Sequence, residues 1–199
     1  MMLKRYVRQA LRELEYATSP KFQPSPSKMK HFDYGIHPQF VEEDDTTPLS
    51  DIRIKYLQRA IGKFLYYARA IDSTMLLALS EVGSAVSKGT EETHKAVQHL
   101  MDYAHSNPDA EIIFRKSEMI LQADSDAAYL VAPEARSRAG GYHFLGTNDY
   151  TLFNGPIHVL AKIIKNVMSS AMEAEIAALF LNAKLIMEYR QTLEEMEHQ

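Results

Sequence analysis

The spacing of apolar residues changes near the middle of the chain, and this change limits the possible folds more than any other feature. Before "SNPDA" at residues 106–110, apart from the proline-rich residues 17–50, apolar residues recur every three or four positions, as on one face of a helix. After it, short runs such as "EIIFR", "MILQADSDAAYL", "GGYHFLG" and "YTLF" alternate with polar turn residues, as strands do, and "NGPIHVL" is interpreted as a bend into a third or fourth strand. The sequence therefore predicts an α+β protein, with helices first and an antiparallel three-stranded meander second.

The helical half divides into an opening helix and a small bundle. Apolar residues at helical spacing predict the opening helix: Leu3, Tyr6, Val7, Ala10, Leu11 and Leu14. The bundle is predicted to contain three helices, the first running from Ile54, the second capped by Asp72 or Ser73, and the third by Thr90.

Residues 17–50 lie between these parts and carry five prolines in a polar stretch. Proline removes a backbone donor and interrupts helices, so this segment is predicted to be a flexible connector. The resulting domain boundaries are 1–50 for the opening helix and connector, 51–107 for the bundle, and 108–199 for the meander and a last helix.

That last helix is predicted to begin at a cap formed by Ser169 or Ser170. Its apolar stripe is expected to face the core and comprises Ile176, Leu179, Phe180, Ala183, Ile186 and Met187. Glu173 and Glu175 lie in the first turn, where the helix dipole favours anions. Dipole compensation is the simplest explanation for this pair.

Asp124 and Asp126 raise a second possibility, because residues two apart on a strand point to the same face. Two acids on one face indicate either a solvated edge or a metal site. If the meander packs on the last helix, Asp126 and a glutamate of that helix could share Mg²⁺, which prefers oxygen ligands. Two such ions can activate water for phosphodiester hydrolysis.

Composition narrows the classes of protein. The chain has 199 residues and no cysteine, which excludes disulfides, thiolate catalysis and zinc ribbons. No apolar run reaches the roughly 18 residues that a membrane span needs. We expect an intracellular protein, cytoplasmic or nuclear, with no membrane partner and no small-molecule cofactor.

Several segments resemble copia-type retrotransposon polyproteins, and they occur in the same order. These segments are "YLQRAIGKFLYYARAIDSTML", "TEETHKAVQHLMDYAHSNPDAEIIFRKSEMIL", "SDAAYL", "RSRAGGYHFLG", "NGPI" and "SSAMEAEIAALF". In that family they span the end of the reverse transcriptase, a helical connection and the start of the ribonuclease H domain. The resemblance extends from "YVRQAL" at residue 6 onward and implies an incomplete ribonuclease H-like meander followed by a long helix.

The resemblance also implies particular site residues. The family's first ribonuclease H aspartate matches Asp126, and its helix glutamate matches Glu175, which Ala178 follows at the expected small-residue position. Asp124 and Glu173 are the weaker candidates for metal ligands. Mg²⁺ is the implied cofactor, and an RNA/DNA hybrid and the rest of the polyprotein are the implied partners.

Arginines supply the candidate contacts to nucleic acid. Arg136 and Arg138 flank Ser137 in "RSR" beside a glycine pair interpreted as a turn, which suits either a phosphate contact or a solvated turn. Arg5 and Arg8 lie on the basic face of the opening helix, near the primer grip according to the resemblance.

The chain also departs from the family pattern. It contains no paired-aspartate polymerase motif such as "YVDD", and no acid follows Glu175 except Glu188, Glu194, Glu195 and Glu197 on the same helix. We therefore expect a fragment that is inactive alone, from a parent that synthesises DNA on RNA and cleaves RNA in hybrids. The alternatives are a noncatalytic nucleic-acid-binding module and a protein-interaction module derived from a retroelement.

Overall fold

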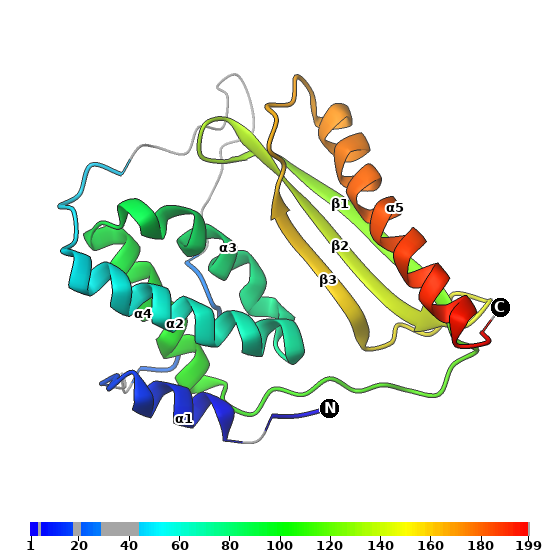
Figure 1. The fold of residues 1–199 in the computed structure, drawn as a ribbon, viewed down its shortest axis with the longest axis horizontal. Coiled ribbons are helices and arrows are strands. Elements are labelled where there is room, and N and C mark those ends of the chain that lie inside the picture. The colour runs from blue at the N-terminus through cyan, green and yellow to red at the C-terminus, as the bar shows by residue number, and fades with distance from the viewer. Residues whose placement is uncertain (4, 18–20, 29–43, 199) are drawn as a thin grey trace. The chain divides into compact units, whose positions relative to one another are not determined.

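The computed structural model describes residues 1–3, 5–17, 21–28 and 44–198, and these form two compact units. The first unit is helical and its described part ends at Ile112, and the described part of the second begins at Ile113. Together they contain five α-helices and one three-stranded antiparallel sheet, which confirms the α+β class among the described residues (Figure 1). No helix in the described ranges combines the length and apolarity that a membrane crossing requires.

The helical unit contains α1 (Tyr6–Glu13), α2 (Asp51–Ala70), α3 (Leu76–Ala85) and α4 (Glu91–Ser106), with short 3-10 turns η1 (Ser73–Met75) and η2 (Val86–Lys88). Its core is made by apolar residues of all four α-helices, among them Val7, Phe64, Leu79 and Met101. The predicted bundle is therefore present. The predicted boundaries placed the opening helix and the bundle in different domains. In the structure, however, α1 contacts α2 and α4 and packs in the same unit as the bundle.

Side-chain caps start two of these elements where the sequence predicted caps. The Thr90 hydroxyl accepts the backbone N–H of Thr93, and the Thr93 hydroxyl accepts the N–H of Thr90, each at 3.3 Å. Asp72 accepts the N–H of Thr74 at 3.3 Å and caps η1. These bonds satisfy amides that have no partner inside the helix.

The predicted connector, residues 17–50, falls partly outside the described residues. Its described part from residue 21 to 28 contacts α4, because the Gln23 N–H donates to Ser106 Oγ at 3.0 Å and Asn107 Nδ2 donates to the Gln23 carbonyl at 3.1 Å. Thr46 and Leu49 also bond to residues near the start of α4. These stretches are attached to the bundle rather than extended away from it.

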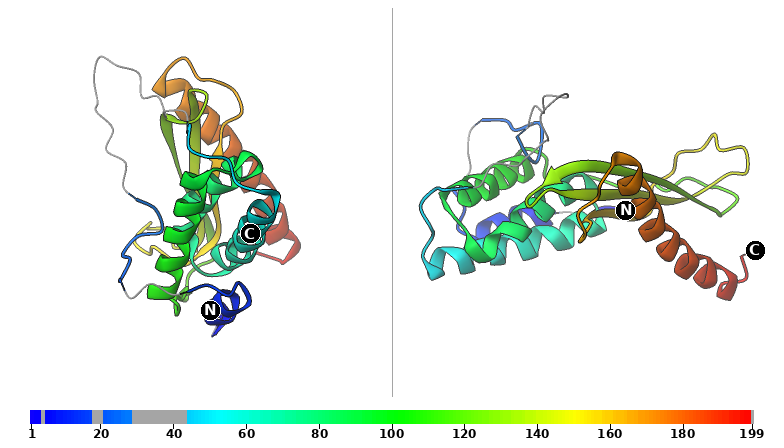
Figure 2. Two further views of the ribbon diagram at one scale, coloured as in Figure 1. Left: turned by 90° about the vertical axis from the view of Figure 1, so that its left-hand side faces the viewer. Right: turned by 90° about the horizontal axis from the view of Figure 1, so that it is seen from above.

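The second unit is a sheet of β1 (Ile120–Ala132), β2 (Arg136–Gly146) and β3 (Pro156–Ile163) in the order β1-β2-β3. The β1–β2 hairpin turns through Glu134 and Ala135, whose φ angles are +61° and +53°. Helix α5 (Ala171–Glu195) follows β3 and packs along one face of β1 and β2 (Figures 1 and 2). The predicted meander and last helix are thus both present.

Two predicted strands and one predicted turn are wrong. "EIIFR" and "YTLF" are not strands, and the buried Asn154 side chain instead bonds the backbone of "EIIFR" to the end of β2. It accepts the Arg115 N–H at 2.8 Å and donates to the carbonyls of Arg115 and Leu145 at 3.0 and 2.8 Å. The pair Gly140–Gly141, interpreted as a turn, lies inside β2.

The glycines in β2 allow α5 to approach the sheet closely. A Cβ atom on Gly141 would stand 1.9 Å from Asn182 Oδ1, so no side chain fits there. Asn182 is buried on α5, and its Nδ2 donates to Ser125 Oγ and to the Gly140 carbonyl, each at 2.9 Å. The hydrogen bonds of this one side chain therefore join α5 to the two longer strands, β1 and β2.

We predict that Gly141→Ala lowers the free energy of unfolding of the sheet unit by about 1–3 kcal/mol, because the added methyl collides with Asn182. Gly140→Ala is the matched control, because a Cβ there meets nothing closer than 3.7 Å and should change stability by less than about 0.5 kcal/mol. Urea titration followed by hydrogen exchange of the β2 amides measures both.

Adding Asn182→Ala should remove the collision, so Gly141→Ala should cost nothing further in the Asn182→Ala background. Equal effects of the Gly140 and Gly141 substitutions would contradict this packing.

Candidate functional site

The two faces of β1 have different surroundings, and this decides where the candidate aspartates point. Ser125 bonds to Asn182 of α5, and Ala127 packs against the core that α5 forms with the sheet. Because neighbouring strand residues point to opposite faces, Asp124 and Asp126 lie on the face away from α5, and both are exposed. Asp124 stands opposite Tyr142 in the register, and burial together with this carboxylate raises the pKa of Tyr142.

Of the two glutamates predicted in the first turn of α5, only Glu173 lies there, because the helix begins at Ala171 and Glu175 is its fifth residue. Ser170 caps the helix by accepting the Glu173 N–H at 3.1 Å, and Ser169 donates its N–H and its hydroxyl to Glu173 Oε2, both at 2.6 Å. These bonds lower the pKa of Glu173, whose carboxylate therefore acts as part of the helix cap. Glu175 lies two residues further along α5, and its side chain is exposed.

The structure does not bring Asp126 and Glu175 together, because the sheet separates the Asp126 side chain from the face that α5 covers. This arrangement does not fit an ion shared by the two carboxylates. Over the described ranges no three histidine or acidic side chains gather as a metal site would require. The matching of Asp126 and Glu175 to the family's acids stays a prediction.

The candidate arginines differ in how freely they could reach a phosphate. Arg5 and Arg8 are exposed at the start of α1, and Arg8 pairs with Asp109 at 2.6 Å. Arg136 pairs with Glu134 across the hairpin turn. Arg138 is only 6% exposed, so its side chain is not presented to solvent. Contacts to the phosphate backbone of a nucleic acid need exposed arginines, and of the two pairs only Arg5 and Arg8 at the start of α1 are both exposed.

A histidine cluster on the α5 side of the sheet was not anticipated from the sequence. His143 of β2 is fully buried and lies opposite His158 of β3 in the register. Their ring centroids are 5.7 Å apart, and the Tyr189 ring of α5 lies 5.8 Å from each. Burial, and secondarily the neighbouring His158, lowers the pKa of His143, although the backbone of His158 opposes the shift. The strand-like alternation of residues in "GGYHFLG" was the one feature of the sequence that could have indicated this cluster.

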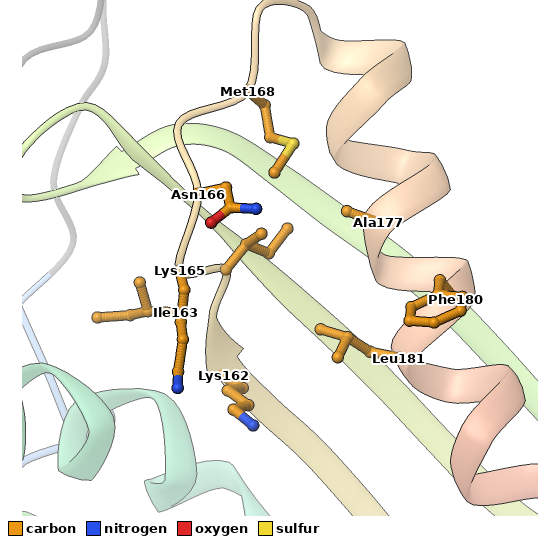
Figure 3. A pocket seen from close by; sticks show the side chains of 9 residues that line it. Lys162, Ile163, Lys165, Asn166, Met168, Ala177, Phe180 and Leu181 are labelled. Carbon is orange, nitrogen blue, oxygen red and sulfur yellow. The ribbon is translucent and has the colours of Figure 1, made fainter.

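A groove of about 350 Å³ lies where the segment after β3 meets α5 (Figure 3). Its lining is mainly apolar and includes Ile164, Met168, Ala177, Phe180 and Leu181, and Lys162, Lys165 and Asn166 provide the polar atoms. No pair of acid and base converges in this lining, so the groove suits apolar contact better than acid–base chemistry.

Comparison with models of known protein families, with curated proteins and with solved structures found no match.

We predict that the sheet unit loses stability as the pH falls below about 6.5, the pKa of a histidine in an unfolded chain. The folded state holds His143 at a lower pKa, so below that pH the unfolded state binds more protons and gains relative stability. His143→Phe keeps the ring contacts with His158 and Tyr189 and should flatten the decline between pH 6.5 and 5. Hydrogen exchange of the β2 amides across this range provides the measurement.

The matched control is His105→Gln on α4, where the side chain is exposed and belongs to the helical unit. It should leave the pH dependence of the sheet unit unchanged. A decline that persists in full in His143→Phe would contradict the assignment.

Proposed function

We propose that this chain is the C-terminal part of a retrotransposon reverse transcriptase and ribonuclease H. The proposal rests on the sequence resemblance and is supported by one structural observation, the order of elements in the second unit. Three antiparallel strands in the order β1-β2-β3 precede one long helix on a single face of the sheet, as expected for the start of a ribonuclease H domain. A separate helical unit precedes it, as the connection implied by the resemblance would.

The chain by itself is proposed to be noncatalytic. Hydrolysis with two Mg²⁺ ions needs several carboxylates around one phosphodiester. Asp126 and Glu175 lie on separate surfaces, and Glu173 is engaged by Ser169. No hydrolytic step can therefore be derived from the described side chains.

A second candidate is a protein-interaction module derived from the same kind of element. The observation that favours it is the outer face of α5, which carries large apolar side chains in contact with solvent. Monomeric soluble proteins seldom expose large continuous apolar surfaces.

Cleavage of an RNA/DNA hybrid distinguishes these candidates. We predict no Mg²⁺-dependent cleavage by the 199-residue chain. A longer chain, translated from the same reading frame through the acids that the family places downstream, should cleave the hybrid. In that chain Asp126→Asn should abolish cleavage, and Asp124→Asn, the matched control on the same face, should preserve it.

Cleavage by the longer chain that is equal in the Asp126→Asn and Asp124→Asn variants would contradict the site assignment. A longer chain that is folded yet inactive would contradict the proposed function and leave the interaction module as the better explanation.

A further inference from the structure

The face of α5 that packs on the sheet is made mainly of small residues, and the opposite face carries most of its large apolar ones. Ala174, Ala178 and Asn182 face the sheet and are almost completely buried. The opposite face carries an apolar stripe of Met172, Ile176, Leu179, Phe180, Ala183 and Met187, which we call the outer stripe. Ile176, Leu179 and Phe180 are 61%, 58% and 64% exposed, although the sequence predicted them as core. A helix that is apolar on both faces is normally buried on both.

We propose that the outer stripe is a self-association surface, on which α5 of a second copy of this chain packs antiparallel. The inference rests on the second candidate function, since it names the partner that the outer face of α5 would bind, and it does not depend on the proposed ribonuclease H chemistry.

The stripe has the symmetry that such a pair requires. Leu179 lies near its middle, and Met172 and Met187 lie at its two ends, eight residues from Leu179 at most. With a two-fold axis near Leu179, Met172 of one copy would lie against Met187 of the other copy, and the reverse. The two surfaces would then be identical and self-complementary, as in an isologous dimer.

Charges beside the stripe favour the antiparallel direction. Glu173 and Lys184 are eleven residues apart, about three helical turns, so both lie on the same side of the stripe. In an antiparallel pair equal sides of the two helices meet, which brings Glu173 of one copy near Lys184 of the other, twice by symmetry. In a parallel pair these two residues would be three turns apart.

The surroundings of the stripe extend the apolar contact and disfavour a lipid surface. Phe180 belongs both to the stripe and to the groove beside β3, so the apolar surface continues beyond the helix (Figure 3). Helices that lie on membranes carry mainly lysine and arginine beside the apolar face. Here Glu173, Glu175 and Glu188 lie on the helix beside Lys184, so acidic and basic side chains are mixed around the apolar surface, with Lys162 and Lys165 in the groove.

The mass of the full chain in solution tests the proposal by sedimentation equilibrium over a range of concentrations. We expect reversible association to twice the 22.7 kDa of one chain. Leu179→Glu should weaken this association by at least about 30-fold, the effect of a central interface residue. The matched control is Ile52→Glu on α2, an exposed apolar position outside the stripe that should leave association unchanged. A chain that stays monomeric at all concentrations, or dimerises equally as Leu179→Glu, would overturn the proposal.

Charge reversal tests the direction of packing. Glu173→Lys and Lys184→Glu should each weaken self-association, since each places like charges opposite one another. A mixture of the two variants should associate more tightly than either alone, because both contacts then join a lysine to a glutamate. That recovery would not occur if the two changes merely impaired the folding of α5. Equal affinities for the mixture and the separate variants would overturn the antiparallel arrangement.

Discussion

The contact between α5 and the sheet through Asn182 determines most of what can be said about the second unit. Asn182 reaches Ser125 on β1 and the Gly140 carbonyl on β2, and it occupies the space above Gly141. A buried amide is costly unless it is bonded, so this arrangement favours one register of the helix on the sheet. Its geometry also explains why β2 has glycine where a β-branched residue would ordinarily pack better.

Two consequences of this contact concern function. Ser125 is held toward α5, so Asp126 points away from the helix that carries Glu175, and the two acids do not form a shared site. The same close approach is made with alanines, which leaves Ile176 and Phe180 on the outer face of α5. The proposed retroelement origin and the proposed self-association surface are therefore independent: the first rests on the sequence and the order of elements, and the second on exposure and charge along one helix.

The sequence predicted elements whose signals are local. Thr90 and Ser170 cap helices where expected, and the meander precedes one long helix, because caps and apolar periodicity act within a few residues. It failed where a distant side chain decides the outcome. Asn154 bonds to the backbone at Arg115, 39 residues away, in a segment predicted as a strand that is irregular chain in the structure. Which face of α5 is buried was likewise not predictable, because both faces carry apolar residues and the long-range contacts of Ala174, Ala178 and Asn182 with the sheet distinguish them.

Disulfide formation in paired cysteine variants tests the face assignment most directly, since the chain has no cysteine of its own. Gly141→Cys with Asn182→Cys should oxidise readily within one chain, because a Cβ on Gly141 would lie 2.8 Å from Asn182 Cγ. Asp126→Cys with Glu175→Cys should stay reduced under the same conditions, as judged by intact mass after thiol alkylation. Rapid intramolecular oxidation of the second pair, with the first pair reduced, would contradict the account and bring the two acids back onto one site.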